Sequence, residues 1–202
     1  GSTTGAIFGI NNTGATGTPT LSITGNSLYR FNGGTGAITM INAGGGGGGR
    51  TISGNTINTV SGVGNVLGIV FSNSPALTVS AVTSNTITGL TSSGAAGPSI
   101  TGIQGQGVGT IVSNTISNFS GVGTTAIITG IQSVSASLST SQNTISNLSG
   151  SGATSPQVNG ISIQLGGAGI NVFKNRIFNL SQTLAVGGAN PLVNGIFVSA
   201  PT

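Results

Sequence analysis

The ionisable side chains of this chain are few, and their types limit its chemistry. The 202 residues include Arg30, Arg50, Lys174, Arg176 and the phenol Tyr29, but no Asp, Glu, His or Cys. General acid–base catalysis needs a group with a tuned pKa, and glycosidases of the usual kind need a pair of carboxylates. A serine nucleophile would have Lys174 as its only candidate base. We therefore expect that the protein is not an enzyme and has no catalytic residue.

The same composition argues against metal, cofactor and nucleic-acid sites. Hard cations prefer carboxylate oxygen and zinc prefers His or Cys, so we expect no metal site and no cofactor. Duplex binding needs several phosphate contacts from a clustered basic surface, and four cations spread along a chain do not supply them. No apolar run approaches the ~20 residues of a spanning helix, so we expect no membrane span.

Hydroxyl and amide groups offer two further kinds of site. A regular Thr array could bind ice, and one position of a repeat reads Ser27, Thr56, Thr86, Thr115 and Thr144. A single column without paired Thr-x-Thr rows is narrow for that role, so ice binding is an alternative and not the main hypothesis. Glycosylation is also chemically possible, because sequons begin at Asn11, Asn118, Asn147 and Asn179.

These residues belong to a repeat that runs through the chain. One Asn recurs at spacings of 29, 30, 29, 29 and 32 residues, at Asn26, Asn55, Asn85, Asn114, Asn143 and Asn175. Apolar residues stand three positions before each Asn, two after it and five after it, and only Thr140 breaks this pattern. Such a period indicates stacked units that each bury an apolar face on their neighbours.

A second anchor in each unit is a small residue followed by Ile. It predicts a core column of Ile10, Ile38, Ile69, Ile103, Ile131, Ile161 and Ile196. Alternating segments such as Ile161-Ser162-Ile163 have the period of a strand, and no stretch has the period of a helix. The sequence therefore predicts an all-β chain, a parallel β-helix of about seven rungs with repeats of about 30 residues.

In such a coil, each column of like residues should stack from rung to rung. We expect the Asn amides to form a ladder at a tight bend, where Asn tolerates left-handed backbone angles. Tyr29 and the seven Phe are expected mostly in core columns, which leaves few aromatic platforms for sugars. The length variation falls in Gly- and Ser-rich loops, residues 44–49, 92–98, 151–156 and 186–191, which could form a contact surface.

Residues 114–121 (NTISNFSG) and 143–150 (NTISNLSG) resemble the repeats of secreted β-strand-repeat proteins. These are adhesin-like surface proteins, mainly of Bacteroidota-type bacteria, and the resemblance implies a right-handed parallel β-helix on the cell surface. It covers nearly the whole chain and is specific for architecture and weak for function. The last unit departs most from the pattern, because Lys174 and Arg176 flank its Asn.

The composition does not shift along the chain, so residues 1–202 are expected to form one continuous domain, a fragment or subunit of a longer assembly. The main functional hypothesis is a rigid rod segment of an extracellular filament or a large cell-surface adhesin. Open strand edges at both ends would favour stacking on other copies or continuation into further repeats. Surface glycans are possible partners, and a polysaccharide-binding β-helix module is the other alternative.

Overall fold

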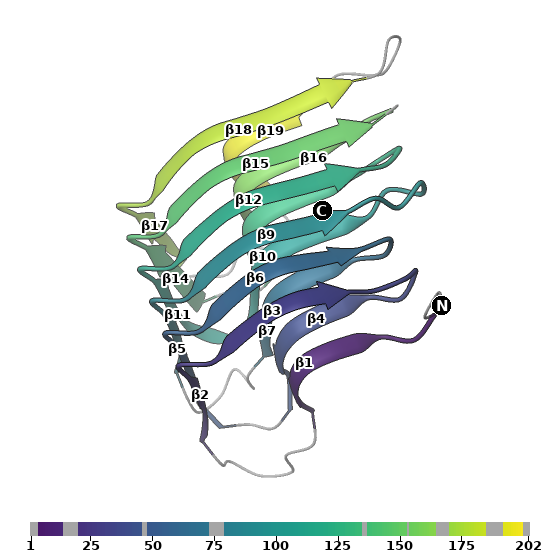
Figure 1. Cartoon of the computed structure of the whole chain (residues 1–202). Coiled ribbons are helices and arrows are strands. Elements are labelled where there is room, and N and C mark those ends of the chain that lie inside the picture. Colours follow the sequence, from purple (N-terminus) through teal and green to yellow (C-terminus); the bar gives the residue numbers. More distant parts are fainter. Residues whose placement is uncertain are drawn as a thin grey trace.

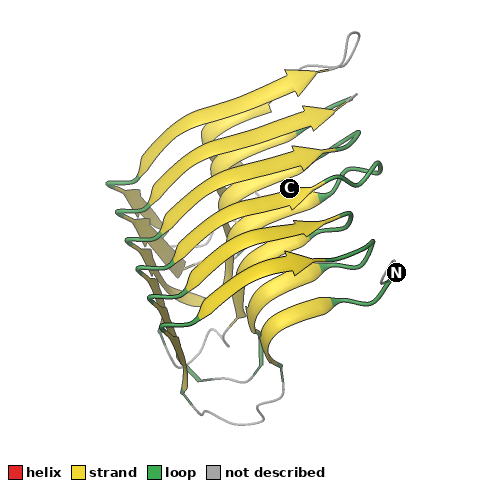
Figure 2. Ribbon diagram, viewed as in Figure 1, coloured by secondary structure: helices red, strands yellow, loops and turns green. Residues whose placement is uncertain are grey.

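The computed structural model describes residues 4–13, 20–45, 48–72, 79–134, 137–152, 154–164, 170–184 and 192–199. This part of the chain contains 19 strands and no helix (Figures 1 and 2). The strands form three parallel sheets. Sheet A contains β1 (Ile7–Asn12), β4 (Ile38–Ala43), β7 (Val66–Ser72), β10 (Ser99–Gln106), β13 (Ile127–Ser133), β16 (Gln157–Gln164) and β19 (Leu192–Ser199).

The other two sheets contain six strands each. Sheet B contains β2 (Leu21–Thr24), β5 (Arg50–Ser53), β8 (Ser80–Thr83), β11 (Val108–Val112), β14 (Ser137–Ser141) and β17 (Asn171–Phe173). Sheet C contains β3 (Ser27–Asn32), β6 (Thr56–Gly62), β9 (Thr86–Ser92), β12 (Thr115–Val122), β15 (Thr144–Gly152) and β18 (Arg176–Leu184).

The chain passes through the sheets in the order A, B, C and returns to A one level higher (Figure 1). Each strand pairs in parallel with its equivalent one repeat away, so the fold is a β-solenoid, which confirms the predicted fold class. The predicted count of about seven rungs is slightly too high. Seven strands line sheet A, but sheets B and C have six each, and five turns separate the six repeated Asn residues.

Aliphatic columns fill the interior, as the repeat predicts. In sheet C, Ile87 pairs with Ile116 and Ile116 with Ile145, and all three side chains are fully buried. The residues three before each Asn form a matching column in sheet B, where Ile111 pairs with Val82 and Thr140. Each buried aliphatic side chain stabilises the fold by roughly 1.5–3 kcal/mol, so the interior rather than ion pairing holds the rod together.

The register corrects one member of the predicted Ile column. Ile10 pairs with Ile41, and Ile41 pairs with Ile69, whereas Ile38 pairs with Ile7 and Val66 in a neighbouring column. The small residue that should precede the true column member is replaced by Met40. The nearest small residue followed by Ile was therefore Ala37, three positions too early.

Met40 stands in a column that is otherwise glycine, at Gly9, Gly68, Gly102, Gly130, Gly160 and Gly195. The glycines of this column from Gly68 to Gly160 leave no room for a side chain. A Cβ built on Gly102 would lie 2.6 Å from the carbonyl oxygen of Gly130 and 3.1 Å from Cγ2 of Ile116. Glycine at this position therefore lets sheet A approach both the next rung and sheet C.

Two columns of left-handed backbone turn the chain between and within sheets. The first is the residue before each repeated Asn, namely Gly25, Gly54, Ser84, Ser113, Gln142 and Lys174, with φ of 55–67°. The expectation that the Asn itself takes the left-handed angle is therefore wrong by one residue. The second column lies within sheet C, at Arg30, Thr59, Gly89, Asn118, Asn147 and Asn179, with φ of 54–68°.

Thr59 is the least suitable residue in the second column, because a β-branched side chain is strained at its φ of 57°. We expect Thr59→Asn to raise the free energy of unfolding by about 1 kcal/mol, since Asn tolerates this conformation. Guanidinium denaturation measures the change. The matched control is Thr56→Asn, an exposed position of the same strand outside the column. A Thr59 variant no more stable than that control contradicts the prediction.

The corner between sheets B and C is two residues long in every coil, whereas the connections at the other two corners vary in length, from Gly107 alone between β10 and β11 to several residues elsewhere. Residues 93–98 and 154–156 lie between sheets C and A, residues 92, 151 and 152 end strands of sheet C, and residue 153 is outside the described part. The described residues of the glycine run lie between sheets A and B. Residues 46–47 of that run and residues 186–191 are outside the described part. Among the described residues, no helix is long and apolar enough to cross a membrane.

Candidate functional site

The repeated Asn residues form a continuous ladder of hydrogen bonds at the corner between sheets B and C. The backbone N–H and Nδ2 of each Asn donate to Oδ1 of the Asn in the following coil, at 2.9 to 3.0 Å. The ladder runs through Asn26, Asn55, Asn85, Asn114, Asn143 and Asn175. Its interior members are buried, so the ladder is a structural feature and not a surface for ligands.

From Asn55 onward, each Asn amide of the ladder also binds the main chain of the preceding coil. Nδ2 of Asn114 donates to the carbonyl oxygen of Val82 at 2.9 Å, and Nδ2 of Asn85 donates likewise to Ile52. In the interior members, Asn55, Asn85, Asn114 and Asn143, Oδ1 accepts two bonds and Nδ2 donates at least two, which satisfies the amide without water. Because the bonds run along the rod axis, they connect successive coils in one register.

The outer face of sheet C carries two adjacent polar columns. The predicted hydroxyl column of Ser27, Thr56, Thr86, Thr115 and Thr144 points outward and pairs in register. A second outward column lies two residues further along each strand, at Asn58, Thr88, Ser117 and Ser146. The outward polar face is therefore wider than one column, although among these strands only β9 has a paired Thr-x-Thr row, Thr86 and Thr88. Sequence period alone could have found the second column, because residues i and i+2 share one face of a strand.

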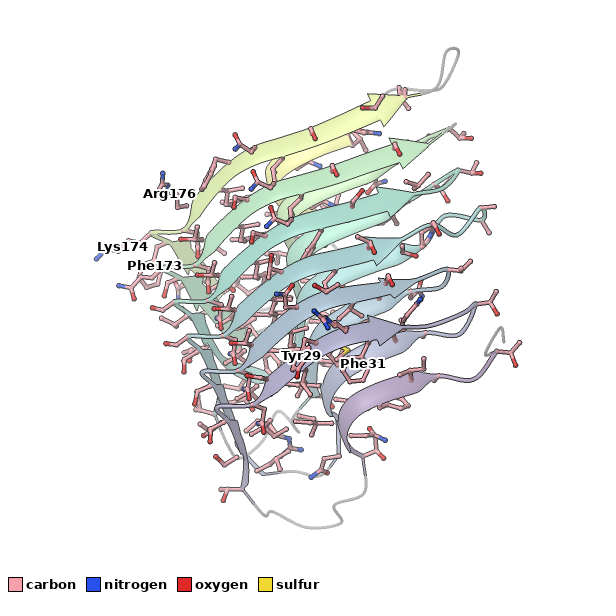
Figure 3. The ribbon with its side chains drawn as sticks, in the orientation of Figure 1. Tyr29, Phe31, Phe173, Lys174 and Arg176 are labelled. Carbon is pink, nitrogen blue, oxygen red and sulfur yellow. The ribbon has the colours of Figure 1, made fainter. Side chains whose placement is uncertain are left out.

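Aromatic and cationic residues replace the hydroxyl groups at the two ends of this face. Tyr29 is 63% exposed on β3, and the neighbouring Arg30 is also exposed. On β18, the exposed Arg176 stands in the Thr column and Phe178 in the second column, with the guanidinium carbon 4.8 Å from the ring centroid. Figure 3 shows Arg176 with Phe173 and Lys174 at the corner where β17 meets β18, and Tyr29 at the other end of sheet C.

The exposed aromatic residues correct the expectation that the Phe side chains lie mostly in core columns. Phe71 and Phe119 are buried, but Phe8, Phe173 and Phe178 are 43%, 48% and 36% exposed. Phe173 pairs with Ser141 and Phe178 with Ser146, and both serines are buried although they point outward. The aromatic residues of the last coil are therefore part of the lateral surface of the rod.

The four sequon asparagines lie at exposed positions with defined roles. Asn118, Asn147 and Asn179 occupy the second left-handed column and bind one another, Nδ2 to Oδ1, at 3.0 and 3.1 Å. Asn11 lies on sheet A, where it accepts a hydrogen bond from Nδ2 of Asn42. Backbone conformation and amide stacking thus explain these residues without glycosylation, and modification stays a prediction.

Arg50 is a buried cation that sequence reasoning did not single out. Its side chain is 2% exposed and donates to the carbonyl oxygens of Ala43, Gly45 and Gly48. The guanidinium thus binds the described part of the glycine run, and burial lowers the pKa of Arg50 from its ordinary value. Carbonyl dipoles take the place of the acidic counter-ion that this chain does not contain.

Stability should be nearly independent of pH across the neutral range. The chain has no Asp, Glu, His or Cys, the side chains that ordinarily titrate between about pH 3 and 9. Burial lowers the pKa of Arg50 from its ordinary value, so linkage makes stability rise with pH between that depressed pKa and the ordinary arginine pKa. We expect calorimetric Tm values to differ by less than about 2 °C between pH 4 and 9. A shift of more than about 5 °C would contradict this reasoning.

The loops between sheets C and A border an open, largely apolar depression lined by Val63, Ala95 and Pro98 with neighbouring glycines. It contains no charged side chain, so any contact there would rest on shape and apolar area. The outer face of sheet C is chemically richer and is the better candidate for a binding site.

Comparisons of the chain with protein-family models, curated proteins and solved structures give no match. The structure establishes the stacked β-solenoid, and the likeness to adhesin-like surface proteins stays a hypothesis carried by the repeat alone.

Proposed function

We propose that this chain is a rigid rod segment of an extracellular filament or a large cell-surface adhesin. The observation that carries the proposal is the unbroken register of all three sheets and of the Asn ladder along one axis. Such a stack resists bending because every coil shares main-chain and amide hydrogen bonds with the next. A chain without Asp, Glu, His or Cys also suits an environment of variable salt and pH, as outside the cell.

The outermost coils support end-to-end association. Ile161 is fully buried, whereas its partner Ile196 on β19 is 52% exposed, and Val158 and Val193 differ in the same way. The last described strands therefore present core-type side chains and strand edges to which another coil of the same pattern could add. That coil would belong either to a second copy or to further repeats.

Electron microscopy combined with light-scattering mass tests the proposal on the purified chain. Long fibres with an axial repeat of ~4.8 Å would identify a filament subunit, and monomeric rods would identify a module of a longer adhesin. The variant Ile196→Lys places a charge on the open end and should abolish fibres. Val122→Lys adds the same charge at a side chain 50% exposed on sheet C and should preserve them. Compact particles that are neither rods nor fibres contradict the proposal.

One observation favours ice binding, namely the second outward column, mostly of hydroxyl side chains, beside the Thr column. Its hydroxyl groups are partly engaged within the protein, since Ser117 donates to Thr88 at 3.3 Å and Asn118 donates to Thr88 at 3.1 Å. The aromatic and cationic ends of the face also interrupt a regular hydroxyl lattice. We therefore keep the structural role as the proposed function.

A further inference from the structure

The geometry points to the outer face of sheet C as a binding site for an acidic polysaccharide. This face, called the sheet C stripe below, consists of the two outward polar columns together with Tyr29 and Arg30 at one end and Arg176 and Phe178 at the other. It goes beyond the proposed rod by assigning an adhesive ligand to one side of it.

The charge of the stripe selects an anionic partner. Its ends carry Arg30 and Arg176, with Lys174 next to the second, and the whole chain contains no carboxylate side chain that could neutralise them. Guanidinium groups bind carboxylate and sulfate oxygens through paired N–H donors. An anionic ligand would therefore meet attraction and no side-chain repulsion anywhere along the rod.

The aromatic residues select a sugar ring rather than a simple ion. The negative face of an aromatic ring attracts the C–H groups on the face of a pyranose, and Tyr29 is exposed enough to offer such a platform. Phe178 is a second exposed ring, and Arg176, whose guanidinium lies over one face of that ring, adds a donor for an acidic substituent at the same place. An aromatic ring and a cation thus lie side by side at each end of the stripe.

The middle of the stripe suits a chain of hydroxyl groups. Between the ends, the two outward columns and the left-handed column beside them contain only Ser, Thr, Asn and Gly, on the four neighbouring strands β6, β9, β12 and β15 of sheet C. Five strand spacings of ~4.8 Å separate β3 from β18, so the two ends are about 24 Å apart and an extended oligosaccharide could reach both. A single-stranded nucleic acid has a phosphate at every nucleotide and would need cations along the whole groove, which this face does not offer.

Binding of polygalacturonate to the chain in solution tests the inference, with dextran as the neutral polymer and oligothymidylate as the nucleic-acid polymer. Polygalacturonate should bind, more weakly as NaCl rises from about 50 to about 500 mM, and the other two should not. Arg176→Gln and Tyr29→Ser should each weaken binding about five-fold. Phe8→Ser removes a comparably exposed ring from sheet A and should leave binding unchanged.

Several outcomes overturn the inference: no binding of polygalacturonate, equal binding of dextran or oligothymidylate, an effect at only one end, or an equal effect of Phe8→Ser. All substituted positions are exposed, so unchanged melting curves would exclude misfolding as the cause. Because the inference rests on the proposed rod, the two tests are read separately. Rods or fibres that do not bind polygalacturonate would contradict the proposed ligand but not the proposed rod. Particles of another shape that bind polygalacturonate would contradict the proposed rod but not the proposed ligand.

Discussion

Replacing Asn114 with alanine should lower the free energy of unfolding by about 3–5 kcal/mol. The substitution removes the oxygen that accepts hydrogen bonds from the backbone N–H and Nδ2 of Asn85, both at 2.9 Å. It also removes the donor to the carbonyl oxygen of Val82. These partners are buried among packed coils, where an unsatisfied polar group costs about 1–3 kcal/mol. Denaturant titration followed by circular dichroism measures the loss.

Asn26→Ala is the matched control for this prediction. Asn26 occupies the same column on the first coil of the ladder, and its side chain is only half-buried. Its Nδ2 donates to Asn55 and to Thr24, and water can replace either bond at this exposed end. We expect a loss of about 1 kcal/mol or less. Equal effects at both positions would show that the ladder does not stabilise the rod through burial of its amides.

The substitution Asn114→Asp tests the acceptor and donor roles of the Asn114 amide separately, because aspartate keeps an acceptor oxygen but loses the N–H donor. The aspartate keeps a carboxyl oxygen toward Asn85 but turns a second oxygen toward the carbonyl of Val82, and burial and this repulsion should raise its folded-state pKa above the unfolded value. A raised folded pKa gives stability that is fully present at low pH and is lost as pH rises through it. The variant should therefore melt higher at pH 3 than at pH 7, whereas the Tm of the unsubstituted protein should hardly change.

Periodicity alone was enough to predict the architecture and the ladder. The Asn spacing and the flanking apolar positions fixed which residues stack, because a solenoid repeats one environment at every coil. The same logic failed where a single coil departs from the pattern. Met40 replaces the glycine that precedes the Ile of this column in the other coils, so the small-residue–Ile pattern does not identify Ile41. The pattern matches Ala37-Ile38 instead, and Ile38 was therefore assigned to the position that Ile41 occupies.

Features that depend on three-dimensional convergence could not be predicted in this way. The burial of Arg50 needs three carbonyl groups, one at the end of β4 and two in the connection after it, to converge on one guanidinium, and the spacing of residues in the sequence does not predict this. The candidate site was missed for a different reason. Aromatic residues were assigned to the core because Phe31 and Phe119 fit its columns, yet Phe178 stands one position off such a column and points outward.

Replacing Gly130 with alanine should destabilise the rod by about 2–4 kcal/mol, although alanine is only one methyl group larger. The new Cβ would lie 2.6 Å from the carbonyl oxygen of Gly160 and 2.7 Å from Cγ2 of Ile145. The carbonyl belongs to a neighbouring strand paired with β13, so relief requires β13 and β16 to separate and their hydrogen bonds to lengthen. Overpacking of a close-packed interior costs about 1–3 kcal/mol, and strained main-chain pairing adds to it.

The same column contains its own control. Gly195 stands in register with the column on the outermost strand, and a Cβ built there has nothing within 4 Å. Gly195→Ala should change the free energy of unfolding by less than about 0.5 kcal/mol. Met40 shows that the column admits a side chain near an open end, since its Cε lies beside the outermost member, 3.1 Å from a Cβ built on Gly9. If Gly130→Ala proved as mild as Gly195→Ala in thermal and denaturant unfolding, the close approach of β13 and β16 could not be what requires glycine.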